Sequence, residues 1–121
     1  MRLKDWLLVG ALLLLLGVGM LPTVAAETDT NLHTTATCAV TSTLALAANE
    51  GRVAALIVNT STQVVWLGIG VAAVVNEGIP VNANNGSYSI GRTFDNYDSE
   101  AINCIVAATT GVVAVTEWAN Q

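Results

Sequence analysis

The residues best suited to covalent chemistry in this 121-residue chain are its two cysteines, Cys38 and Cys104. In an oxidising compartment an even cysteine count predicts a disulfide. Such a bond closes a loop of about 66 residues and contributes roughly 4 kcal/mol to stability in the chain-entropy model. In a reducing compartment the two residues would instead be buried thiols that pack as small hydrophobic side chains.

Oxygen ligands for a metal ion are concentrated in one segment, residues 95–100, with the sequence Asp-Asn-Tyr-Asp-Ser-Glu. Calcium takes about six to eight oxygen ligands, so Asp95, Asp98 and Glu100 are candidate calcium ligands. Their spacing does not fit an EF-hand loop, and an acidic loop exposed to solvent is the commoner explanation. We therefore expect no cofactor, with calcium as the alternative.

No combination of residues predicts catalysis. His33 is the only histidine and lies in a polar segment, where we expect it to be solvated. Neither a second histidine nor a Cys-x-x-Cys pair is present to bind zinc. The Gly68-Ile69-Gly70 pattern lacks the later glycine and the helix of a phosphate-binding loop. We predict that the protein is not an enzyme.

The N-terminal segment 1–26 directs the chain to a membrane. A short basic start is followed by an uncharged apolar run, Trp6–Ala26, which ends in small residues before Glu27. This layout fits a signal peptide cleaved after Ala26. It equally fits a retained transmembrane helix, because about 20 apolar residues make roughly 30 Å of helix. Both alternatives place the rest of the chain outside the cytoplasm, in a virion, the cell envelope or the extracellular space.

The charge of residues 27–121 excludes nucleic acid as a partner. These residues contain two arginines, Arg52 and Arg92, and eight carboxylates, which gives a net charge of −6. A domain with two cations lacks the basic surface that neutralises phosphates. Few charges and many small residues instead favour an oligomer whose subunits rest against one another.

The strand pattern predicts an all-β fold. Residues 27–37 are polar and lack an apolar period, so we expect an arm or linker there. From 38 to 121, short strands alternate with turns at roughly ten-residue spacing. This pattern predicts a small antiparallel β-sandwich, of jelly-roll or Ig-like type, with about seven to eight strands. The strands are expected at 41–47, 53–59, 64–69, 79–81, 87–90, 101–107 and 112–118.

Several details of pairing follow from local signals. The strand 64–69 is expected to pair with 53–59, and tight hairpins are expected at 82–86 and 109–111. Leu44 and Leu46 should share one face of their strand. Pro80 marks an edge strand, and Gly68 marks a bulge or a close backbone approach.

Aromatic residues supply the candidate interface. Trp66, Phe94, Tyr97 and Trp118 come from separate segments, so packing in a core or against a subunit is favoured over a sugar-binding row. Asn59-Thr60-Ser61 matches the N-glycosylation sequon, although chance matches are expected in a chain this rich in Asn and Thr.

From Thr41 to Trp118 the order of signals resembles the small β-sandwich modules of bacteriophage virion proteins, of the capsid-decoration, head-fibre and spike type. The resemblance is carried by Arg52 before a central strand, the Gly-x-Gly strand end at 68–70, the Gly-Ile-Pro-Val edge at 78–81 and the terminal Glu117-Trp118. It implies a structural, capsid-associated protein that packs against neighbouring subunits, here behind a membrane segment. The alternative is a secreted or envelope-tethered bacterial surface protein, such as a filament subunit or an adhesin.

Overall fold

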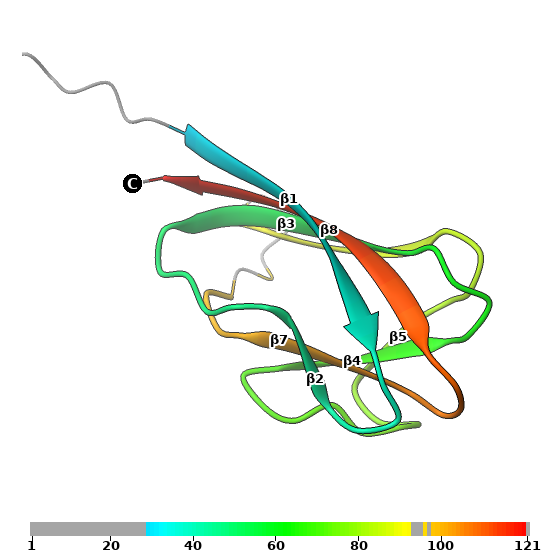
Figure 1. Ribbon diagram of the computed structural model, residues 1–121. Helices are drawn as coiled ribbons and strands as arrows, with labels where there is room; N and C mark the ends of the chain where they lie inside the picture. The colour runs from blue at the N-terminus through cyan, green and yellow to red at the C-terminus, as the bar shows by residue number, and fades with distance from the viewer. Residues whose placement is uncertain (1–28, 93–95, 97, 121) are drawn as a thin grey trace, which may run out of the picture.

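The chain folds as a β-sandwich of two antiparallel sheets with four strands each (Figure 1). The computed structural model describes residues 29–92, 96 and 98–120. Across these residues no helix is both long enough and apolar enough to cross a membrane. The N-terminal segment 1–26, expected as a signal peptide or anchor helix, lies outside the described residues.

The two layers are named here sheet A and sheet B. Sheet A has the strand order β1-β8-β3-β6, and sheet B has the order β2-β7-β4-β5. Sheet A consists of β1 (Asp29–Cys38), β8 (Gly111–Asn120), β3 (Arg52–Asn59) and β6 (Gly86–Gly91). Sheet B consists of β2 (Thr43–Leu46), β7 (Ile102–Val106), β4 (Val65–Ile69) and β5 (Ile79–Val81).

Most consecutive strands lie in opposite sheets, and only β4 and β5 are neighbours both in sequence and in a sheet. The expected pairing of 53–59 with 64–69 is therefore wrong, because β3 pairs with β6 and β8. The hairpins expected at 82–86 and 109–111 are also wrong, since each of these turns leads from one sheet to the other. Asn84 and Asn85 do adopt positive φ, 58° and 75°. A turn motif reverses the chain, but it does not specify which sheet the next strand joins.

The polar N-terminal segment belongs to the sandwich. The sequence predicts an arm or linker over 27–37, whereas residues 29–37 form most of β1 and pair with β8 along its whole length. Threonine favours strands, and this edge strand contributes little to the core apart from Ala36 and Cys38. A strand with so few core positions lacks the apolar alternation by which strands are recognised in sequence.

The core lies between the sheets and is filled from alternate positions of the strands. In β8 the odd-numbered residues 111–119 are buried, while the even-numbered ones are half-buried or exposed. In β2 the alternation is interrupted by a register shift between Leu44 and Leu46. Leu46 is therefore buried while Leu44 is 55% exposed, and the expectation that they share a face is wrong. The central cluster comprises Cys38, Ala45, Leu46, Ala55, Ile57, Val65, Leu67, Val81, Ile90, Ile102, Cys104, Val106, Val113 and Val115.

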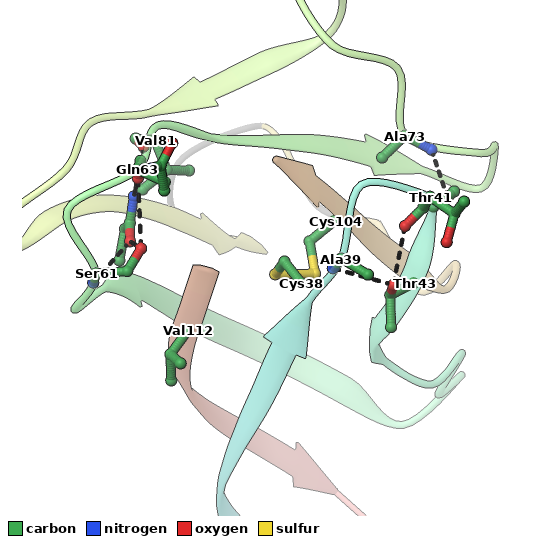
Figure 2. Close-up of a disulfide and its surroundings, with 12 residues drawn as sticks. Cys38, Ala39, Thr41, Thr43, Ser61, Gln63, Ala73, Val81, Cys104 and Val112 are labelled. Atoms are coloured by element: carbon green, nitrogen blue, oxygen red, sulfur yellow. Dashed lines mark hydrogen bonds between the residues drawn. A yellow bond between two sulfur atoms is a disulfide. The ribbon is translucent and has the colours of Figure 1, made fainter. Parts of the chain in front are cut away.

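The disulfide predicted between Cys38 and Cys104 is present and joins the two sheets (Figure 2). Cys38 ends β1 in sheet A, and Cys104 is the middle residue of β7 in sheet B. Both residues are fully buried. A disulfide indicates an oxidising environment, such as the cell envelope or the extracellular space.

A buried ion pair closes one end of the sandwich. Nε of Arg52 lies 2.7 Å from Oε2 of Glu117, and their side chains are 0% and 7% exposed. The guanidinium also donates to the carbonyl oxygens of Ala47, Asp98 and Glu100 at 2.8 to 2.9 Å. One cation thus joins β3 and β8 to the loops that lead into β3 and β7.

The other end of β3 is anchored by Asn59, which is fully buried. Its amide nitrogen donates to the carbonyl oxygens of Gln63 and Val81, and its Oδ1 accepts from the backbone and hydroxyl of Ser61. Figure 2 shows Ser61, Gln63 and Val81 gathered at this point. Asn59 therefore acts as a structural bridge to β5, and the folded chain does not present it to a glycosylating enzyme.

Gly68 and Pro80 have the roles expected of them. A Cβ at Gly68 would lie 2.7 Å from the carbonyl oxygen of Val71 and 2.8 Å from that of Ala72, so the loop after β4 folds closely over this residue. Pro80 lies in β5, the edge strand of sheet B.

We predict that replacing both Cys38 and Cys104 with alanine lowers the free energy of unfolding by about 4 kcal/mol, because the unfolded chain gains the entropy of an open loop. Chemical denaturation of the oxidised wild type and the double variant measures the difference. Equal midpoints would contradict a stabilising role for the bond.

We predict that Glu117→Leu lowers the free energy of unfolding by about 3 to 5 kcal/mol, because it leaves the Arg52 cation buried without a counterion. Glu77→Leu is the matched control, since Glu77 is exposed in a turn. The double variant Arg52→Met with Glu117→Leu should regain part of the loss. A single variant as stable as the control would show that the ion pair is dispensable.

Candidate functional site

The candidate site is the outer face of sheet A, which turns away from the core. Because buried and outward positions alternate along a strand, the outward residues of β8 include Val112, Ala114, Thr116 and Trp118. Their partners in the neighbouring strands face the same way. The rows across the sheet are Asn31–Trp118–Ala54–Gly91, His33–Thr116–Leu56–Ser89 and Thr35–Ala114–Val58–Ser87.

None of the residues in these rows is Asp, Glu, Lys or Arg. The face combines hydroxyl, amide and small apolar side chains with the larger Leu56 and Trp118, and Trp118 is 39% exposed. Nδ1 of His33 lies 3.1 Å from Oγ1 of Thr116 on this surface. This face can be buried against a neighbouring subunit without removing a charged group from water. Desolvation of charges is a large free-energy cost of association.

A second apolar surface lies at the loops beside sheet B. The hydroxyl of Ser42 accepts a hydrogen bond from the backbone of Ala73 at 2.8 Å, which ties the loop after β1 to the loop after β4. These loops carry Val40, Val71 and Val74, which are 55%, 65% and 46% exposed. A hollow of about 110 Å³ is lined in part by Val71 and Val74. That volume is well below the roughly 300 Å³ at which ligand pockets begin.

The two tryptophans predicted as interface residues lie on opposite outer faces. Trp66 is in β4 between the buried residues Val65 and Leu67, so it faces outward from sheet B. There its strand partners are Pro80 and Ile105. Trp118 faces outward from sheet A, and the two side chains therefore cannot form one patch. Phe94 and Tyr97 lie outside the described residues.

The candidate calcium ligands are only partly described. Oδ1 of Asp98 accepts a hydrogen bond from the backbone of Glu100 at 2.8 Å. The carbonyl oxygens of both residues are turned toward Arg52. Among the described residues no three carboxylate, histidine or cysteine side chains come together as a metal site. Asp95 lies outside them, so calcium binding stays an untested alternative to the absence of a cofactor.

Comparison with known protein families, curated proteins and solved structures finds no match to this chain. The resemblance to phage virion modules therefore rests on the residues and turn spacing described above.

Sequence reasoning found the cysteine pair but missed the uncharged face and the buried Arg52–Glu117 pair. A signal for the pair was present, because Glu117 occupies the same parity as Val113 and Val115 in an otherwise uncharged strand. To predict the uncharged face, one must know that β1 pairs with β8, and no local signal in the sequence indicates this pairing.

We predict that Thr116→Lys weakens association of the protein with its neighbours, because it places a charge at the centre of the uncharged face. Thr110→Lys is the matched control, since Thr110 is exposed in the loop before β8. Both surface changes should alter the free energy of unfolding by less than about 0.5 kcal/mol. Incorporation into the native assembly measures the effect, and equal incorporation of the two variants would contradict a role for this face.

Proposed function

We propose that this chain is a structural subunit of a virion, which packs against neighbouring subunits outside the cytoplasm. The observation that carries the proposal is the strand order, β1-β8-β3-β6 facing β2-β7-β4-β5. In this order the first strand lies beside the last, and the chain alternates between sheets as in an eight-stranded jelly roll. In an Ig-like sandwich the first two strands share one sheet, whereas β1 and β2 lie in opposite sheets here.

The jelly roll is common in viral capsid domains, and it also occurs in lectins and cupins. Fold alone is therefore an analogy and does not determine function. The uncharged outer face of sheet A adds an argument from the surface. A free monomer with a net charge of −6 in residues 27–121 would be expected to distribute its charges over its whole surface. A face kept free of charge supports the packing role.

The disulfide favours a second candidate, a secreted or envelope-tethered surface protein such as a filament subunit or an adhesin. Cys38–Cys104 is buried between the sheets and fits a protein that matures in an oxidising compartment. Together with segment 1–26, this fits cleavage and secretion as well as membrane anchoring. The two candidates share the packing role and differ in the fate of the N-terminus.

Mass spectrometry of the native protein separates the two candidates. We expect the chain in purified virus particles, with an intact N-terminus and a mass two hydrogens below that of the reduced chain. A chain that is absent from particles and recovered from the medium, beginning at Glu27, would overturn the virion proposal in favour of the secreted protein.

A further inference from the structure

The two sheets end in four edge strands, β1 and β6 in sheet A and β2 and β5 in sheet B. The outer edge of such a strand presents backbone N–H and C=O groups that can pair with another chain. Proteins that avoid this pairing shorten the edge strand, insert a bulge or a proline, or cover the edge.

Three of the four edges carry such a device. β2 has four residues and a register shift at its centre. β5 has three residues and contains Pro80. The edge of β6 is covered by Asn96, whose side chain accepts from the backbone N–H of Gly91 at 3.1 Å and donates to the carbonyl of Ser89 at 2.9 Å.

β1 carries none of these devices. It has ten residues in unbroken register with β8 and contains no proline, and its only charged residue is Asp29 at its first position. No described residue pairs with its outer edge. The longest edge of the sandwich is thus the one left open.

The hydrogen-bonding alternation identifies which groups lie on that edge. The N–H of Thr60 donates to the carbonyl of Val112 at 3.1 Å, so the Val112 carbonyl points toward β3. Backbone N–H and C=O groups alternate in direction along an antiparallel strand. The backbone groups of Val113, Val115 and Glu117 therefore point toward β1. Their partners are the even-numbered residues of β1.

The backbone N–H and C=O groups of the odd-numbered residues of β1 consequently point away from β8. The open edge is formed by the backbone groups of Asn31, His33, Thr35 and Thr37. The same alternation, carried across β3 to β6, directs the groups of Ser89 and Gly91 outward. These are the backbone groups with which the side chain of Asn96 forms its hydrogen bonds.

We infer that the open edge of β1 pairs antiparallel with β1 of a second copy, so that two sheets A form one eight-stranded sheet. The inference rests on the proposed packing role and names its surface and partner. A two-fold axis suits this edge because an antiparallel pair of identical strands is self-complementary. Since β1 is uncharged from 30 to 38, two acidic copies meet there without opposing like charges.

Leu32 supplies an apolar contact beside the proposed seam. It pairs with the buried Glu117 and therefore lies on the inner side of sheet A, yet it is 47% exposed. Sheet B does not cover this part of β1, because β2 is only four residues long. In the proposed dimer Leu32 lies between the two copies of sheet B.

Sedimentation of the full chain, as the cell matures it, tests the inference with two proline variants. Thr35→Pro removes an N–H from the open edge of β1 while sparing the bonds to β8. Ser87→Pro is the matched control, because its N–H points outward from β6 at the other edge of the same sheet. We expect wild type and Ser87→Pro to sediment as dimers and Thr35→Pro as a monomer.

Amide hydrogen exchange gives a readout that does not depend on the variants. In the wild type, the outward amides of Asn31, His33 and Thr35 should exchange as slowly as the inward amides of Leu32 and Thr34. In a monomer only the inward amides are protected. Thr35→Pro should speed exchange at the outward amides of Asn31, His33 and Thr37 and leave the inward amides of Leu32 and Thr34 protected.

A monomeric wild type, or fast exchange at the odd-numbered amides of a dimer, would overturn the inference. So would a Thr35→Pro dimer that keeps these amides protected. The proposed function fails separately, when the chain is absent from purified particles. If the chain dimerises through β1 but is absent from particles, only the virion proposal is contradicted. If it is present in particles as a monomer, only the pairing of β1 with β1 is contradicted.

Discussion

The sandwich depends most directly on the buried contact between Arg52 and Glu117. A guanidinium without access to water must have its charge balanced and its N–H groups bonded. Here Glu117 supplies the balancing charge, while the carbonyls of Ala47, Asp98 and Glu100 accept three further hydrogen bonds. This requirement orients two central strands of sheet A and determines where two loops return to the core. Apolar packing alone is not directional and would leave these loops less restricted.

Local signals predicted the all-β class, seven of the eight strands and the disulfide, because each depends on residues close in sequence or on the expected export. Pairing was less accessible: the turns at 82–86 and 109–111 reverse the chain, but their residues do not encode a change of sheet. β1 escaped detection because an edge strand rich in threonine lacks an apolar period. The candidate surface was hidden for the same reason, since its rows exist only once β1, β8, β3 and β6 are placed side by side.

Charge and edge protection divide the surface of the molecule into regions with different capacities for association. The outer face of sheet A offers hydroxyl and small apolar groups without charge, while Glu50 and Glu77 lie in turns between strands. Asn96 covers one edge of this sheet, and β1 leaves the other open. A subunit built in this way can pair through β1 and pack through the outer face of sheet A while its acidic turns remain in water.

The pairing of β1 with β8 also sets the order of events in time. The first strand finds its partner in the last ten residues before Gln121, and Cys38 must wait for Cys104. Synthesis proceeds from the N-terminus, so β1 emerges long before sheet A can close. The edge strand β1 therefore cannot join sheet A until β8 has been made.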